Sequence, residues 1–84
     1  MKIEFHKNFK KKYKKLPSKL QDKFDERLRI FVDDLFAPEL HNHCLHGKYA
    51  HCRSINITGD LRALYEVKGD GVCFLDIDTH SALY

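Results

Sequence analysis

The spacing of apolar residues changes once along this chain, from the three- and four-residue steps of a helix to the alternation of a β-strand. From Leu20 the large apolar residues recur at steps of four, four, three and four as far as Leu35, which is the stripe of an amphipathic helix. After residue 51, apolar and polar residues alternate in three short runs, which predicts three strands. The chain therefore divides into a helical first half and a β-rich second half.

The first sixteen residues predict a short strand and a basic helix. Residues 2–6 alternate between polar and apolar side chains, which places Ile3 and Phe5 on the core side of a strand. A helical stripe follows, formed by Phe9, Tyr13 and Leu16. Lysines occupy the other faces of this predicted helix.

A second helix is predicted after Pro17, which cannot continue the first one. Ser18 and Gln21 have the spacing of a capping box, so we expect the new helix to begin there. The helix should end before Pro38, because the residue that precedes a proline disfavours helical geometry. The two helices are therefore expected to form a hairpin.

The second half predicts an antiparallel sheet. Alternating runs lie at 52–58, 62–67 and 72–78, and the turns between them are short and contain glycine, as in β-hairpins. With 84 residues, of which 43% are apolar, the chain has enough material for one core. We predict a single domain over residues 1–84 with an α+β fold: an N-terminal strand and a helix pair packed on an antiparallel sheet of about four strands.

The charge of the chain is unevenly distributed. Residues 1–36 contain 11 Lys and Arg against 6 Asp and Glu, whereas residues 37–84 contain 4 against 6. Six lysines and no acidic residue lie between Lys7 and Lys15. Such a segment attracts phosphate backbones or an acidic partner, and it is also compatible with an ordinary solvated helix face.

Three of the six histidines fall between His41 and His46, in a predicted loop that also contains Gly47. Histidine exchanges protons near neutral pH, so this cluster suggests acid–base catalysis. Zinc binding and a purely structural surface role are the alternatives. The possible zinc ligands are His41, His43, Cys44, His46, His51 and Cys52. They lack the paired spacing of usual zinc sites, so we expect no metal or other cofactor.

Two arginines flank the first predicted hairpin. Arg53 and Arg62 lie on adjacent strands, and Asp60 lies in the turn between them. In a suitable register both guanidinium groups would converge on one phosphate with bidentate geometry. Pairing with Glu66 or Asp76 on an exposed sheet face is the alternative.

Three short motifs occur in order in the second half of the chain. They are H-x-L-x-G from His43, R-x-x-x-I-x-x-D from Arg53, and T-H-S-x-L-Y at residues 79–84. With these motifs the chain resembles the RelE/ParE superfamily of type II toxin–antitoxin toxins, and its YafQ-like mRNA interferase branch in particular. The resemblance implies a small cytoplasmic endoribonuclease that cuts mRNA on the ribosome without a metal ion and is silenced by a cognate antitoxin in a hetero-oligomer.

The resemblance also implies roles for particular residues. His80, His43 and Asp60 match positions that take part in cleavage, and Arg62 matches an arginine that contacts the scissile phosphate. The expected substrate-binding residues are Arg62, Arg53, Lys48, Tyr84, Lys11 and Lys14. Which group is the general acid and which the general base stays open at this stage.

Two residues depart from the YafQ-like pattern. Asn56 stands where a further catalytic histidine is usual, and an amide cannot move a proton at neutral pH. Asp78 stands where glycine usually precedes the Thr-His-Ser motif, and its carboxylate would repel RNA, raise the pKa of His80, or mark an inactive variant. The alternatives are therefore a ParE-like toxin that inhibits DNA gyrase without cutting RNA, and a catalytically decayed RNA- or antitoxin-binding module.

The lysine-rich helix has a specific interpretation in this setting. Its lysines are expected to neutralise ribosomal RNA phosphates, each adding about 0.9 to the logarithmic salt slope of binding; they are Lys10, Lys11, Lys12, Lys14 and Lys15. No apolar run approaches the length of about 20 residues that crosses a membrane, and no secretory signal is evident. We therefore expect a cytoplasmic protein with reduced cysteines.

Overall fold

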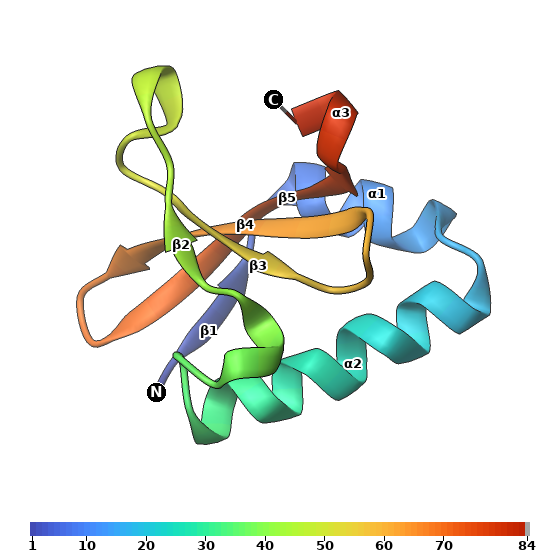
Figure 1. Cartoon of the computed structure of the whole chain (residues 1–84), viewed down its shortest axis with the longest axis horizontal. Helices are drawn as coiled ribbons and strands as arrows, with labels where there is room; N and C mark the ends of the chain where they lie inside the picture. Colours follow the sequence, from blue (N-terminus) through green and yellow to red (C-terminus); the bar gives the residue numbers. More distant parts are fainter. Residues whose placement is uncertain (84) are drawn as a thin grey trace.

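A computed structural model describes residues 1–83 and shows helices packed on one face of a five-stranded sheet (Figure 1). The elements in chain order are β1 (Ile3–Phe5), α1 (Lys7–Lys15), α2 (Ser18–Asp33), η1 (Pro38–Leu40), β2 (His43–Cys44), η2 (Gly47–Tyr49), β3 (Arg53–Asn56), β4 (Leu61–Lys68), β5 (Gly71–Thr79) and α3 (His80–Leu83). The predicted α+β fold and the strand–helix–helix order of the first half are confirmed.

The sheet has the strand order β1-β5-β4-β3-β2. The pairings β3–β4 and β4–β5 are antiparallel as predicted and β2–β3 is antiparallel as well, but β1 runs parallel to β5, so the sheet is mixed. The fifth strand, β2, lies in the segment predicted as a loop. It pairs only two residues with β3, which is too short a run to show a period in the sequence.

The helix hairpin forms on either side of Pro17, but the predicted capping box does not. Pro17 itself precedes the first turn of α2, and Ser18 is already helical without a side-chain capping bond. The amide Nε2 of Gln21 instead donates to the carbonyl of Tyr13 at 2.8 Å. This tertiary bond joins the two helices, and it uses the side chain that the capping box would have required.

The core lies between the helices and one face of the sheet. Phe74, on the central part of β5, is fully buried. Five aromatic rings lie with their centroids 5.4–5.8 Å from its ring, namely those of Phe5, Phe9, Phe24, Phe31 and Tyr65. Ile3 and Phe5 pack against this core, as the alternation of residues 2–6 predicts. The helices thereby close one face of the sheet, and the other face remains for the site.

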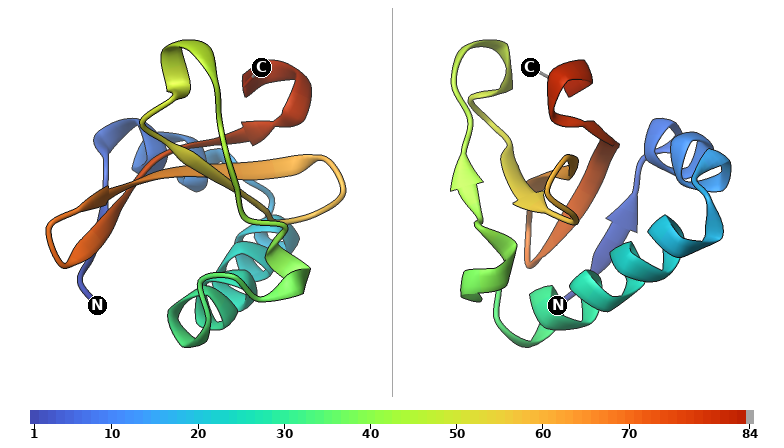
Figure 2. Two further views of the ribbon diagram at one scale, coloured as in Figure 1. Left: turned by 60° about the vertical axis from the view of Figure 1, so that its left-hand side comes forward. Right: turned by 45° about the vertical axis from the view of Figure 1, so that its right-hand side comes forward.

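A smaller cluster partly covers that second face. It consists of Leu45, Cys52, Leu64 and Leu83. The connection between β2 and β3 and the short helix α3 stand side by side there, away from α1 and α2 (Figure 2). Within the described residues, no helix combines the length and apolar character needed to cross a membrane.

Candidate active site

Strand register places several polar residues side by side on the sheet face opposite the helices; we call this the open face. Arg62 on β4 pairs with Asn56 on β3 and with Asp78 on β5. Their neighbours Ala63 and Ile77 belong to the core on the helix side. Because successive strand residues point to opposite faces, the three polar side chains project from the open face. His43 pairs with Ser54, two residues from Asn56, and shares that face.

The end of the sheet brings Asp60 and His80 together from positions twenty residues apart. The backbone N–H of His80 donates to the carbonyl of Asp60 at 2.8 Å. The hydroxyl Oγ1 of Thr58 accepts from the backbone N–H groups of Asp60 and Leu61, which fixes the turn before β4. His80 is the first residue after β5, and both Asp60 and His80 are exposed.

The side chain of Arg62 donates hydrogen bonds to the turn that precedes β4. Its Nη1 donates to the carbonyls of Thr58 and Gly59, at 2.9 Å in each case. Within residues 1–83, its Nε–H and Nη2–H groups make no hydrogen bond. A guanidinium ion stays protonated at any physiological pH, so this side chain stabilises negative charge and cannot act as a base.

His43 is exposed at the beginning of β2, and its tautomer follows from one contact. Its Nδ1 lies 2.7 Å from the carbonyl oxygen of His41. A carbonyl only accepts hydrogen bonds, so Nδ1 carries the proton. In the neutral ring Nε2 then has a free lone pair, which is the state that a general base requires.

Arg53 does not meet Arg62, contrary to the convergence considered from the sequence. It lies three residues from Asn56 along β3 and therefore projects from the helix side of the sheet. Its Nε donates to Asn42 at 2.8 Å, and its Nη1 lies 2.7 Å from the Cys44 sulfur. These contacts join the Arg53 side chain of β3 to the segment that contains β2.

The lysines expected to bind RNA lie in different surroundings. Lys48, in η2, stands over the Tyr49 ring and lines a groove of about 350 Å³ on the open-face side. Lys11 lines a hollow of about 270 Å³ beside β5. Lys14 instead borders an apolar groove between α1 and α2. Tyr84, the expected aromatic contact, lies outside the described residues.

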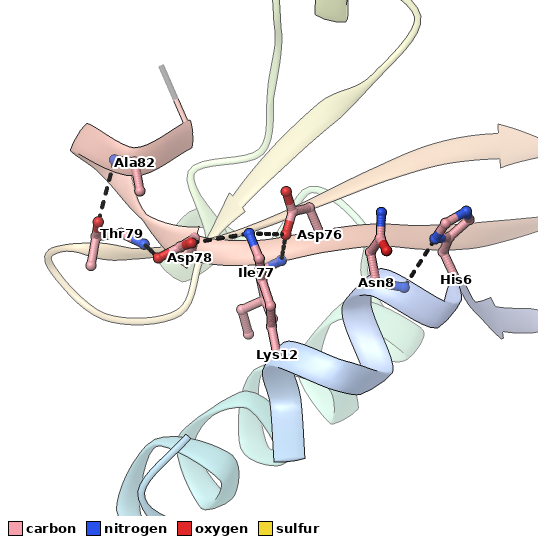
Figure 3. A network of polar contacts seen from close by, with 8 residues as sticks. All are labelled: His6, Asn8, Lys12, Asp76, Ile77, Asp78, Thr79 and Ala82. Atoms are coloured by element: carbon pink, nitrogen blue, oxygen red, sulfur yellow. Dashed lines mark hydrogen bonds and ion pairs between the residues drawn. The ribbon is translucent and has the colours of Figure 1, made fainter. Parts of the chain in front are cut away.

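Lys12, one of the lysines expected to neutralise RNA phosphates, contacts two carboxylates of β5. Its Nζ lies 2.9 Å from Oδ1 of Asp76 and 3.0 Å from Oδ2 of Asp78 (Figure 3). The backbone N–H of Thr79 and then the ammonium of Lys12 lower the pKa of Asp78, so this carboxyl is ionised at neutral pH. Lys12 is therefore paired within the protein, unlike Lys11 and Lys14, which form no ion pair within residues 1–83.

Two further polar groups are missed by sequence reasoning. Within residues 1–83, Oδ1 of Asn56 and Oγ of Ser54 are buried without a hydrogen-bond partner. Such groups are uncommon in folded proteins and are often satisfied by water or a ligand. The departure of Asn56 from the YafQ-like pattern was the only sequence signal at either position.

The arrangement has the parts needed for proton transfer beside a bound anion. His80 and Asp60 are exposed groups able to exchange protons and Arg62 lies at the turn beside them, whereas His43, also exposed, lies on β2, on the far side of β3. Among the described residues, no group of three His, Cys, Asp or Glu side chains is placed to hold a metal ion. Asp60 and His80 thus place two groups able to exchange protons next to the guanidinium of Arg62.

Comparisons with known proteins identify relatives of the same fold. The model of a family described as a bacterial toxin of a type II toxin–antitoxin system, YafQ, matches residues 1–84. The crystal structure of YafQ from Escherichia coli is similar with a TM-score of 0.83 at 17% identity, covering 99% of this chain and 97% of that chain. A search of curated proteins gives no match.

Two other solved structures are also similar. The E. coli DinJ–YafQ toxin–antitoxin complex matches with a TM-score of 0.80 at 18% identity, covering 99% of this chain and 96% of that chain. A copper-bound mutant toxin from Helicobacter pylori matches with a TM-score of 0.77 at 25% identity, covering 100% of this chain and 99% of that chain.

Proposed function

The chain belongs to the YafQ family of bacterial type II toxins, and on that premise we propose that it cuts mRNA on the ribosome as an endoribonuclease. One observation carries this proposal. The backbone bond from His80 to Asp60 joins two exposed proton-exchanging residues at the turn that Arg62 holds. This is the minimum set for cleaving a phosphodiester without a metal ion.

The reaction we propose is a transesterification within the RNA. The 2′-oxygen of the ribose attacks phosphorus while a general base removes its proton. The bond to the 5′-oxygen breaks, and a general acid gives that oxygen a proton, so the protons balance. His80 is the leading acid or base, and Asp60 or His43 is its counterpart; positioned groups of this kind contribute roughly 10²–10⁴-fold.

The phosphorane that forms during attack carries extra negative charge, and Arg62 is the residue we assign to it. Its Nη1 is fixed by the turn carbonyls, so the rest of the guanidinium fork is held in place before substrate arrives. Lys48 lines the groove on the open-face side and Lys11 lines the hollow beside β5, and we assign both to phosphates that flank the cleaved one. Arg53 is left out of this site because it projects from the other face.

An antitoxin is the proposed partner in the cell. Solved relatives include DinJ–YafQ toxin–antitoxin complexes, and this chain carries a formal net charge of +3. A complementary acidic or amphipathic segment would be captured quickly by such a field. We propose that the toxin is held in a cytoplasmic hetero-oligomer until that partner is removed.

The test uses purified ribosomes, a defined message and primer extension. The wild type should cut within the codon in the ribosomal A site, and His80→Ala should remove cutting while its circular dichroism spectrum stays unchanged. His46→Ala is the matched control, because His46 is an exposed histidine of the loop outside the proposed site. Its cutting should persist.

Four outcomes would contradict the proposal. Full cutting by His80→Ala would remove the assigned residue, and loss of cutting by a toxin that is treated with a chelator and freed of it before it meets the magnesium-containing ribosomes would overturn the metal-free chemistry. Inhibition of DNA gyrase without RNA cutting would favour the ParE-like alternative. Neither activity in a folded wild type would favour the decayed binding module, for which Asn56 is the supporting residue.

A further inference from the structure

The end of β5 carries two carboxylates on the open face. Asp76 pairs in register with Leu64, and Asp78 pairs with Arg62. Both carboxylates lie within 3.0 Å of the same nitrogen, Nζ of Lys12, so they are within about 6 Å of each other. A phosphodiester that approaches Arg62 must therefore enter beside two negative charges.

One lysine of α1 reaches across to both of them. Figure 3 shows the Lys12 side chain extending from the helix to Asp76 and Asp78. The hydrogen bond to Asp76 is the main cause that raises the pKa of Lys12; burial opposes it, and the hydrogen bond to Asp78 adds to the rise. The ammonium therefore stays charged and removes one of the two negative charges from the edge of the site.

The same network leads into the segment that carries His80. Oδ1 of Asp78 accepts from the backbone N–H of Thr79 at 2.8 Å, while its Oδ2 accepts from Lys12. Oγ1 of Thr79 then accepts from the backbone N–H of Ala82 at 3.3 Å, inside α3. Lys12 thus anchors the strand end from which His80 is presented.

We propose that Lys12 is a positioning residue of the active site, the internal counter-ion that lets an RNA phosphate approach Arg62 past Asp76 and Asp78. This inference rests on the proposed function. It differs from the expectation that every lysine of α1 contacts RNA. Of the α1 lysines, Lys12 alone forms an ion pair with the sheet within residues 1–83.

The experiment measures binding of a fluorescent 2′-deoxy oligonucleotide that cannot be cleaved, over a range of salt concentrations. Lys12→Met should weaken binding roughly three- to tenfold across the salt range used, because two neighbouring carboxylates within a Debye length then face the nucleic acid unopposed. The logarithmic salt slope should stay within about 0.3 of the wild type, since no phosphate contact is lost.

Lys11→Met is the matched variant, because it removes the same charge from the same helix. Lys11 lines the hollow beside β5 and makes no ion pair within the part of the chain that the structure describes. If it contacts phosphate, its loss should lower the salt slope by about 0.7, the value for a single-stranded nucleic acid. The logarithmic salt slope of binding, and not affinity alone, therefore distinguishes Lys12→Met from Lys11→Met.

Rescue separates charge compensation from a merely structural role. The double variant Lys12→Met, Asp78→Asn should regain most of the lost affinity, and Lys12→Arg should behave as the wild type. Thermal unfolding is measured in parallel. A purely structural lysine would give a double variant that binds as weakly as Lys12→Met, and this result would overturn the inference.

The two proposals fail in different ways. A wild type that binds the oligonucleotide but never cuts mRNA would overturn the proposed function and leave the binding comparison valid. A fall in salt slope of about 0.7 in Lys12→Met would show that Lys12 contacts phosphate directly, and would overturn the inference while cutting persists.

Discussion

Replacing Arg62 by alanine tests whether this residue builds the turn as well as the chemistry. The substitution removes the two bonds of 2.9 Å from Nη1 to the carbonyls of Thr58 and Gly59. A hydrogen bond to a charged group contributes about 1.5–3 kcal/mol when buried, and far less when exposed. Because Arg62 is half-buried, we expect Arg62→Ala to lower the free energy of unfolding by about 1–3 kcal/mol in total.

The protein should remain folded after this loss. A chain of 84 residues has a stability of about 4–13 kcal/mol at typical values per residue. Urea denaturation followed by circular dichroism gives the change directly, and the denaturant slope m should not change. Activity is then measured at a temperature where both proteins are folded, so that lost cutting reports the missing guanidinium.

Arg62→Lys separates the two roles. A lysine retains the charge and can donate to one of the turn carbonyls, but it lacks the planar fork that binds phosphate in a bidentate manner. We expect it to recover about half of the lost stability and little of the activity. An unchanged free energy of unfolding in Arg62→Ala would refute the structural half of this reasoning, and full cutting by Arg62→Lys would refute the catalytic half.

Two further substitutions probe the ends of β5. Gly71→Ala should lower the free energy of unfolding by about 2 kcal/mol or more, measured by thermal unfolding. The new methyl group would collide with the backbone carbonyl of Lys2, which already accepts a hydrogen bond from the backbone N–H of Val72. Asp78→Asn tests how the free energy of unfolding depends on pH in the acid range. The pKa of Asp78 is lowered, first by the N–H of Thr79 and then by Lys12, so its contribution is present above pH 3.8 and is lost as the pH falls through the lower folded value. The difference from wild type should be below about 1 kcal/mol at neutral pH and vanish in acid; a difference independent of pH would contradict it.

Local sequence pattern was sufficient for most of the secondary structure. The stripe from Leu20 to Leu35 and the alternation after residue 51 depend only on which face of an element is buried, and each element shows this in its own residues. The capping box failed for a related reason. Gln21 has two possible partners, and the tertiary one, the carbonyl of Tyr13, is the one it uses.

The sheet shows where local pattern stops being informative. Alternation says that Arg53 and Arg62 each belong to a strand, but the face of each depends on the register between β3 and β4. A shift by one residue exchanges the two faces of a whole strand. Short motifs indicated His80, Asp60 and His43 as candidates, yet only strand pairing brings the backbones of Asp60 and His80 into contact.

The amino-acid order by itself determined the helix hairpin, the strands after residue 51 and the identity of the residues that can exchange protons. The tertiary structure alone decided that β1 pairs in parallel with β5, that Arg53 projects from the helix side of the sheet, and that Lys12 forms ion pairs with Asp76 and Asp78. The physical reason is range. Periodicity and turns act over a few residues, whereas register, ion pairing and charge compensation depend on contacts between segments tens of residues apart.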